Sequence, residues 1–167
     1  MRIETERLVI TDFTPDMAQA VHLGSMDPDT QRFLPDEVFP TVEAAAEVIA
    51  DLTACYSGTE GPFVHPFLLP GGVYAGYVQL VPLEEGWEVG YHTVAAHTRK
   101  GYATEALRAF LPEMMARFSL QEVAGVCDAD NAASIRVLEK CGFRRVFEGN
   151  ALYQGRMRPV VKLIYTP

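Results

Sequence analysis

Residues 87–107, WEVGYHTVAAHTRKGYATEAL, join a strand-like run to a helix-like run through a short basic loop. The aromatic and branched residues up to about Val94 predict a strand. From Gly101 onward, apolar residues recur every three or four positions, which predicts an amphipathic helix that ends near Phe118. Pro112 lies inside this helix and lacks a backbone N–H, so we expect it to bend or split the helix.

The residues before this stretch predict a strand, two helices and a set of hairpins. The run RLVITDF predicts the first strand, and Thr14-Pro15-Asp16 then predicts a helix start, because these residue types suit the cap and the first turn. The prolines between Asp27 and Pro40 predict an irregular loop. An alanine-rich second helix follows, and then three strands with short glycine-containing connections, which predict an antiparallel meander at residues 62–69, 73–83 and 87–94.

The residues after it predict a short buried strand at 122–127, a helix from about Asn131 to Gly142, and closing strands at 143–148 and 154–165. The strands on either side of the Gly101 helix should be parallel neighbours, because such units cross over right-handedly. We therefore expect one α/β domain over residues 1–167. Its central sheet should be mixed, mostly antiparallel, of about seven strands, with helices on both faces.

The amino-acid composition and net charge argue against several classes of function. The chain has 167 residues, 49% apolar and 22% charged, and no apolar run approaches the ~18 residues of a membrane span. The start MRIETERLVI lacks the features of a secretory signal, so we expect a cytoplasmic protein. A net charge of −8 without a basic stripe argues against nucleic acid and would attract a cationic amine. The three cysteines and four histidines lack disulfide or metal-ligand spacing, so we expect no metal.

The loop before the Gly101 helix predicts an anion site. Backbone N–H groups at a helix start have no helical partner and lie at the positive end of the helix dipole. Gly101 and Ala103 keep the turn free of bulk, Arg99 and Lys100 add charge, and Thr104 adds a hydroxyl. The alternative is an ordinary cap with solvated charges. A mononucleotide P-loop is excluded, because the chain has no GxxxxGK[ST] motif.

A second polar helix start lies downstream, in NAASIRVLEKCGF at 131–143. Asn131 and Ser134 are one turn apart and should lie on the same side of the helix. The alternative is that Asn131 only caps the helix and Ser134 is a first-turn hydroxyl.

Together these segments resemble a known family. RKGYATEAL (99–107) and NAASIRVLEKCGF are similar to the acyl-CoA-binding region of GNAT N-acyltransferases, and ETERLVI (4–10) and EVGYHTV (88–94) resemble the branch of the ribosomal-protein N-terminal acetyltransferases RimJ and RimL. The resemblance implies a GNAT fold whose sheet is splayed between its fourth and fifth strands, and acetyl-CoA as cosubstrate. It implies a coenzyme-binding set of Thr93, Val94, Arg99, Lys100, Gly101, Tyr102, Ala103, Thr104, Asn131 and Ser134. The chain departs from common family patterns at Thr98, often Arg or Gln, and at Leu138, often Tyr.

The resemblance also suggests a mechanism. Glu88 matches the glutamate of the branch's E-x-G-Y pattern and is the candidate general base, the alternative being a solvent-facing strand carboxylate. A backbone N–H near Thr93 or Val94 is expected to polarise the carbonyl, and Ser134 to donate a proton to the leaving thiolate. His92 is a weaker candidate for substrate contact or base. The segment from Asp27 to Pro40 is expected to wall the acceptor pocket.

Three questions stay open at this level. The acceptor is either a protein or peptide N-terminus, which the branch favours, or a small amine. A non-catalytic acyl-CoA-binding or regulatory module would keep the same coenzyme motifs. A homodimer is possible by analogy with the family.

Overall fold

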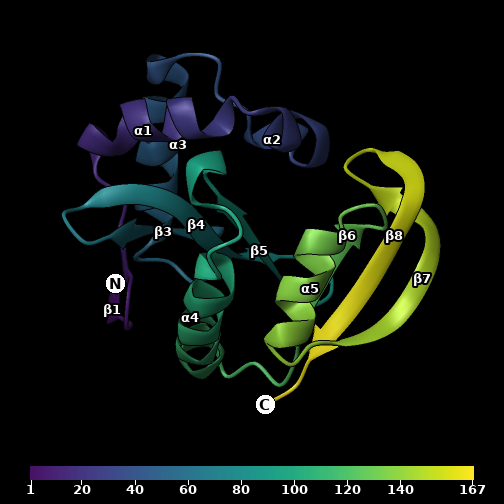
Figure 1. The fold of residues 1–167 in the computed structure, drawn as a ribbon. Coiled ribbons are helices and arrows are strands. Elements are labelled where there is room, and N and C mark those ends of the chain that lie inside the picture. The colour runs from purple at the N-terminus through teal and green to yellow at the C-terminus, as the bar shows by residue number, and fades with distance from the viewer.

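The computed structural model describes all residues 1–167 and places eight strands in one sheet, in the order β1-β2-β3-β4-β5-β6-β8-β7 (Figure 1). Helices α4 and α5 cover one face, and α1 and α3 cover the other. The strands are β1 (Arg2–Glu4), β2 (Val9–Thr11), β3 (Phe63–Leu69), β4 (Val73–Pro82), β5 (Trp87–Thr93), β6 (Val123–Asp128), β7 (Arg144–Tyr153) and β8 (Arg156–Tyr165). The helices are η1 (Pro15–Met17), α1 (Ala18–Ser25), α2 (Pro28–Phe33), η2 (Pro35–Glu37), α3 (Val42–Cys55), η3 (Ala95–His97), α4 (Tyr102–Phe118) and α5 (Ala132–Lys140).

The sheet agrees with the predicted fold class and differs in one strand. The antiparallel meander β3-β4-β5 and the parallel pair β5-β6 are as predicted. The eighth strand arises because the N-terminal segment forms two short strands, β1 and β2, which pair antiparallel, where the sequence predicted one strand over residues 7–13. The turn between them is closed by Thr5, whose N–H donates to the Leu8 carbonyl.

The expectation that Pro112 splits its helix is wrong, because α4 runs unbroken from Tyr102 to Phe118. Pro112 lies on the exposed face of α4, one turn after the exposed Arg108. The Arg108 carbonyl, which loses its helical partner at the proline, therefore faces water and can be hydrated.

The expected loop from Asp27 to Pro40 is also wrong in part, because it contains α2 and the short helix η2. The Asp27 side chain caps α2 by accepting hydrogen bonds from the N–H groups of Asp29 and Thr30, both at 3.1 Å. Pro28 and Pro35 each occupy a first helical position, where proline is favoured rather than disruptive.

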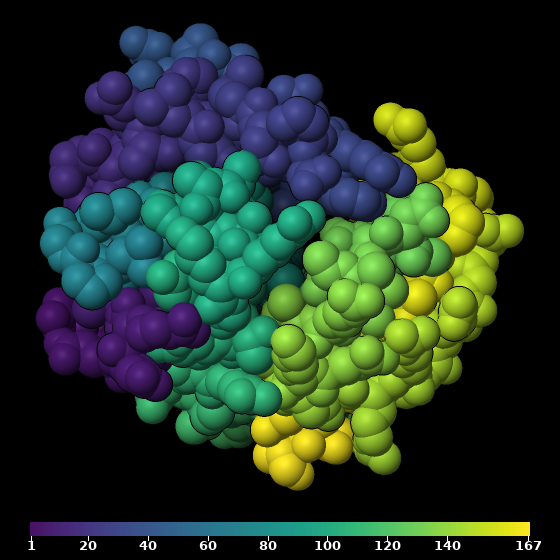
Figure 2. Space-filling view, viewed as in Figure 1, coloured from purple at the N-terminus to yellow at the C-terminus, as the bar shows by residue number.

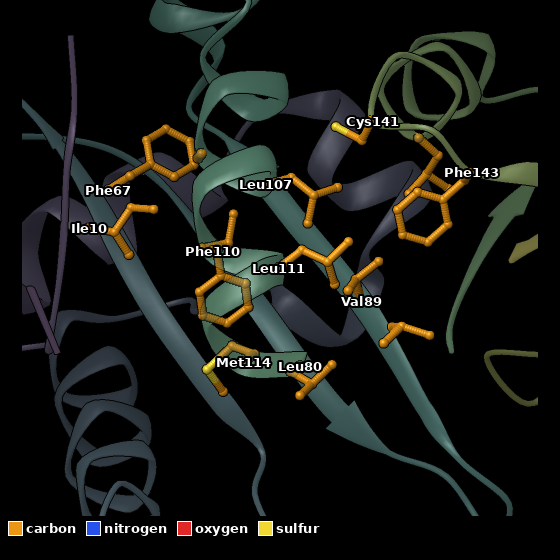
Figure 3. Packing of buried hydrophobic residues seen from close by; sticks show 14 of the residues in the cluster. Ile10, Phe67, Leu80, Val89, Leu107, Phe110, Leu111, Met114, Cys141 and Phe143 are labelled. Atoms are coloured by element: carbon orange, nitrogen blue, oxygen red, sulfur yellow. The ribbon is translucent and has the colours of Figure 1, made fainter. Parts of the chain in front are cut away.

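The main core lies between α4 and the sheet (Figure 3). Leu107, Phe110, Leu111 and Met114 form a fully buried stripe along α4, as its periodicity predicted, and they pack over Val89 of β5 and its neighbours. Burying each such side chain contributes roughly 1.5–3 kcal/mol. This packing fixes the N-terminus of α4 relative to the end of β5. None of the helices combines the length and apolarity needed to cross a bilayer.

The sheet is splayed between β5 and β6, as the resemblance implied for the corresponding strands. These two strands pair at one position, Glu88 with Ala124, whereas β6 pairs with β8 along its whole length and β5 pairs with β4 along its whole length. Beyond Glu88 the two halves of the sheet therefore diverge. Figure 2 shows the resulting groove between the surfaces of α4 and α5.

Candidate functional site

The end of β5 presents unpaired backbone groups to the gap. The Val94 N–H donates to the Ala75 carbonyl of β4 at 2.9 Å. Backbone groups of successive strand residues point to opposite sides, so those of Tyr91 and Thr93 point away from β4, toward β6. Of the two residues expected to supply the polarising N–H, Val94 is therefore excluded, because its N–H is already bonded to β4. The Thr93 N–H remains available.

The start of α4 is uncapped. Gly101 has φ 82 and precedes the helix without any side-chain cap, and the first helical bond runs from the Glu105 N–H to the Gly101 carbonyl at 3.0 Å. The N–H groups of Tyr102, Ala103 and Thr104 consequently have no helical acceptor. The sequence predicted these free amides, and amides at a helix start are the groups that an anion would contact.

The basic residues of the loop differ in their roles. Lys100 folds back, with Nζ donating to the Ala96 carbonyl at 3.1 Å. Arg99 is exposed and adopts a left-handed backbone conformation with φ 62. Such a conformation costs a residue other than glycine roughly 1–2 kcal/mol, so the loop shape must be held by other contacts.

Glu88 lies where the ladder between β5 and β6 stops. Burial raises the pKa of its carboxyl to about 7, although a hydrogen bond from the backbone of Val126 and the nearby Lys162 both act to lower it. In β6 the Ala129 N–H, just past the strand end, donates to β8, so the backbone groups of Val126 face the gap. The Glu88 carboxylate therefore takes the N–H that would continue the ladder. The Tyr153 hydroxyl takes the matching Val126 carbonyl at 3.4 Å.

His92 shares the sheet face of Glu88 and is tied to α2. Its Nε2 lies 2.8 Å from Thr30 Oγ1, and the Thr30 hydroxyl donates its only hydrogen to the Asp27 carboxylate. His92 Nε2 must then carry the hydrogen shared with Thr30, which leaves the lone pair on Nδ1. Burial lowers the pKa of His92, while Asp27 acts in the opposite direction. The ring therefore anchors α2 to the sheet in its neutral form.

Ser134 lies on the opposite sheet face from Glu88, at the start of α5. The Tyr91 hydroxyl donates to the Ser134 carbonyl at 2.7 Å and lies 2.7 Å from Ser134 Oγ, and Cys127 Sγ lies 3.3 Å from the same oxygen. Asn131 caps α5, because its Oδ1 accepts a hydrogen bond from the Ser134 N–H at 3.1 Å. The amide nitrogen of Asn131 makes no hydrogen bond within the chain, so the capping role leaves a donor for a ligand.

The segment α2–η2, which we call the roof, covers the sheet face that carries the Glu88 side chain. Hydrogen bonds attach it to both halves of the splayed sheet. On the β4 side, the Tyr77 hydroxyl donates to Glu37 at 2.6 Å, and burial raises the pKa of Glu37. On the other side, Gln154 Nε2 in the β7–β8 turn donates to the Phe33 carbonyl at 2.8 Å, and Arg32 lies 3.4 Å from Asp130. Figure 1 shows α2 beside the end of the β7–β8 hairpin.

Glu88 thus lies at the point where β5 and β6 diverge, on the face that α2–η2 covers, and Ser134 lies on the α5 face. The free amides lie at the start of α4, and Arg99 and Lys100 lie in the loop before it. Sequence reasoning missed Tyr91 as the partner of Ser134, Tyr153 beside Glu88, and Arg7, whose guanidinium reaches the α4 loop. The strict alternation of β5 could have assigned Tyr91 to the face of the buried Val89.

Comparisons with known proteins agree with this geometry. The sequence model of the acetyltransferase (GNAT) domain matches residues 7–144. Among curated proteins, the chain is 28% identical over 147 residues to the uncharacterized N-acetyltransferase YnaD of Bacillus subtilis strain 168, covering 87% of this chain and 84% of that protein.

Solved structures show the same fold. An acetyltransferase of the GNAT family from Bacillus anthracis superposes with a TM-score of 0.84 at 24% identity, covering 99% of this chain and 98% of that one. RimL, a ribosomal-protein α-N-acetyltransferase in complex with coenzyme A, superposes with a TM-score of 0.84 at 17% identity, covering 99% and 98%. At these identities the likeness establishes the fold alone.

Proposed function

Because the chain belongs to the GNAT acetyltransferase family, we propose that it transfers the acetyl group of acetyl-CoA to a primary amine by direct attack. The observation that carries this proposal is the splay between β5 and β6, which opens beside an uncapped helix start. The opening offers unpaired strand groups to an amide-containing arm and bare amides to a diphosphate, which are the two recognition elements of coenzyme A.

The residues of the opening fit this coenzyme. The amides of Tyr102, Ala103 and Thr104 would hold the pyrophosphate, with Arg99 and Lys100 supplying charge. The backbone groups of β5 that face the gap would pair with the pantetheine arm, assisted by the Asn131 amide. Bound acetyl-CoA would supply an activated acyl group whose leaving thiol has an ordinary pKa of about 8.5.

Glu88 would act as the general base, directly or through one water. A free α-amine has a pKa of about 8, so it is mostly protonated near neutrality and must lose a proton before it attacks. A carboxylate with a pKa of about 7 accepts that proton much more readily than an ordinary glutamate. Glu88 also lies on the roofed face, opposite Ser134, so the amine and the thiol would meet across the gap.

Residues that line the gap between β5 and β6 would polarise the acetyl carbonyl and protonate the leaving thiol. The Thr93 N–H would polarise the acetyl carbonyl as the amine nitrogen forms its bond to the carbonyl carbon. As the carbon–sulfur bond breaks, the Ser134 hydroxyl would donate a proton to the departing sulfur and regain one from water. The Tyr91 hydroxyl, which donates to the Ser134 carbonyl and lies 2.7 Å from Ser134 Oγ, would hold Ser134 in place.

For the acceptor, we favour the N-terminal amine of a protein or peptide over a small amine. The motifs at 4–10 and 88–94 support this choice through their likeness to the RimJ and RimL branch. The acidic roof supports a cationic amine of either kind, because Asp29, Asp36 and Glu37 lie on it and the net charge is −8.

The test is to incubate the protein with acetyl-CoA and separate panels of N-terminal peptides, polyamines and aminoglycosides, and to follow release of free thiol. We expect thiol release with at least one peptide and retention of acetyl on its α-amine by mass spectrometry. Thermal stabilisation by coenzyme A with no thiol release on any acceptor would instead identify a non-catalytic binding module. Release with small amines only would replace the protein acceptor.

We also propose that two copies associate through β7. This strand is the outer strand of the sheet, and four of the nine large hydrophobic side chains that are exposed lie on the β7–β8 hairpin: Val146, Phe147, Leu152 and Met157. An antiparallel pairing of two β7 strands about a two-fold axis between Val146 and Phe147 would cover these two residues and set Arg145 opposite Glu148 of the second copy.

A further inference from the structure

We infer that Arg7 is a positioning residue for the phosphate-binding loop at residues 99–104, which it holds in shape through Glu105 and the Lys100 carbonyl. The inference rests on the proposed coenzyme site and adds to it a residue more than ninety positions upstream of the loop. Arg7 lies in the connection between β1 and β2, outside every motif assigned to coenzyme binding.

Arg7 is bound to the first turn of α4 by several hydrogen bonds. Its Nε donates to Glu105 Oε2 at 2.7 Å, its Nη2 lies 2.6 Å from the same oxygen, and its backbone N–H donates to Glu105 Oε1 at 2.9 Å. The Thr5 hydroxyl donates to Glu105 Oε1 at 2.6 Å. The Arg7 guanidinium also lies over the Tyr102 ring, 4.7 Å from its centroid. Such a fork-shaped set of charge-assisted bonds holds both partners in one geometry.

The same guanidinium controls the loop directly. Arg7 Nη1 donates to the Lys100 carbonyl at 2.9 Å. Lys100 lies between two left-handed residues, Arg99 with φ 62 and Gly101 with φ 82. A carbonyl at this position would repel a phosphate if it turned toward the helix start. By holding the carbonyl outward, Arg7 keeps the strained loop in the form that leaves the amides of α4 free.

Arg7 has a second effect through charge. Burial alone would raise the pKa of Glu105, but hydrogen bonds from Thr5 and Arg7 and the Arg7 charge lower it, so Glu105 is ionised. An unpaired carboxylate in the first turn of α4 would oppose an anion at the same helix start. Arg7 neutralises this charge while its own side chain is 43% exposed, compared with 18% for Glu105.

Glycine at position 101 is accounted for by its φ of 82, and Arg7 lies in ordinary contact distance of this turn. Nη2 of Arg7 lies 3.5 Å from the point that a Cβ on Gly101 would occupy. The loop, the helix start and the N-terminal segment therefore meet at Gly101.

The first experiment measures binding of coenzyme A by calorimetry and kinetics with acetyl-CoA for Arg7→Met, Arg7→Lys and a matched control. The control is Arg2→Met, which breaks the exposed ion pair between Arg2 and Glu4 in the same N-terminal segment. We expect Arg7→Met to raise the Kd for coenzyme A and the KM for acetyl-CoA about tenfold, with kcat within twofold. Arg7→Lys should be intermediate, because an ammonium keeps the charge and loses the fork.

The second experiment needs no coenzyme. Hydrogen–deuterium exchange of the free protein should be faster in Arg7→Met than in wild type for the peptide over residues 99–104, and unchanged over residues 73–82. Equal exchange in the loop, or wild-type affinity for coenzyme A in Arg7→Met, would overturn the inference. Failure of the wild-type protein to bind coenzyme A would instead refute the proposed function, and the exchange result would still decide whether Arg7 holds the loop.

Discussion

The Glu88 carboxylate replaces a strand partner at the point where β5 and β6 part, and burial raises its pKa to about 7. A base with this pKa is fully ionised only above neutrality. We predict that Glu88→Gln lowers kcat/KM roughly 10²–10³-fold, and that the break in the wild-type pH profile near 7 disappears. Stopped-flow thiol detection from pH 5.5 to 9 measures both. Glu85→Gln, in the exposed turn before β5, is the control and should keep the wild-type profile.

The buried Glu88 carboxylate should lower the free energy of unfolding, and its raised pKa determines how that free energy changes with pH. The ordinary pKa is 4.5 and the folded value about 7, so between these values the unfolded chain releases the proton that the folded chain retains. Stability therefore falls as pH rises from 4.5 to 7 and then levels off. We predict that Glu88→Gln is more stable than wild type by roughly 1–3 kcal/mol above pH 7 and that the difference shrinks toward pH 4.5. A stability difference independent of pH in urea titrations would contradict this.

Ser134 is half-buried and contacts Tyr91 and Cys127. Because a thiol leaves readily even without a donor, we predict that Ser134→Ala lowers kcat only about tenfold and leaves the KM for acetyl-CoA unchanged. Steady-state kinetics measure this, with Ser57→Ala in the exposed turn after α3 as the control. An unchanged kcat would remove Ser134 from the mechanism.

Candidate site residues were easier to propose from the sequence than the residues to which they are hydrogen-bonded. Glu88, Asn131 and Ser134 could be proposed because each has a motif around it, whereas the bond from Tyr91 to Ser134 joins residues 43 positions apart. His92 was weighed as a base, but its Nε2 is engaged with Thr30, a contact across 62 positions that depends on α2. Local sequence carries no information about such pairs until the topology is known.

The N-terminus of α4 offers a test of an element rather than of a side chain. Gly101 has φ 82, and Gly86, in the turn before β5, has φ 86 with no heavy atom near the position of its missing Cβ. Alanine at either position adopts a strained conformation, which costs about 1 kcal/mol or more. We predict that Gly101→Ala and Gly86→Ala lose similar stability in thermal melts.

Only Gly101→Ala should weaken binding of coenzyme A, by roughly tenfold in calorimetry, because only Gly101 belongs to the turn that leaves the amides of α4 free. Equal affinity in the two variants would show that the helix start is not the phosphate site.

The sequence-based prediction of helices was wrong where proline was interpreted only as a residue that interrupts helices. Thr14-Pro15-Asp16 was recognised as a helix start, yet Asp27-Pro28-Asp29 has the same chemistry and was assigned to a loop. Pro112 was treated as a breaker, although its position on the exposed face of α4 leaves the freed carbonyl to water. The periodic core stripe of α4 and the alternating strands were predicted correctly, because burial repeats along them.

For the whole molecule, association through β7 has a direct test. We predict a mass near twice the 18.5 kDa of the chain by light scattering at micromolar concentration. Val146→Lys should give the monomer mass, because it places a charge at the proposed two-fold axis. Val73→Lys, at an exposed position of β4, should leave the mass unchanged. A wild-type protein that is monomeric at all concentrations would exclude the proposed pairing.

The order and pairing of the strands were predicted better than the side-chain hydrogen bonds between segments that are distant in the sequence. The single mixed sheet and its splay followed from the strand order and the family motifs. The attachment of α2–η2 to both sheet halves by Glu37 and Gln154 did not, since these hydrogen bonds join segments up to 121 positions apart. Such contacts depend on the crossing of distant chain segments, which periodicity does not encode.

The side-chain bonds to Val126 bear on how quickly coenzyme enters. Glu88 and Tyr153 occupy the hydrogen-bonding groups with which β6 could otherwise close onto β5. No hydrogen bonds between β5 and β6 have to break before coenzyme A enters the gap. The protein without coenzyme therefore already has the conformation that binds it. Association should then be a single bimolecular step whose rate rises linearly with coenzyme concentration and never reaches a plateau set by a slow opening.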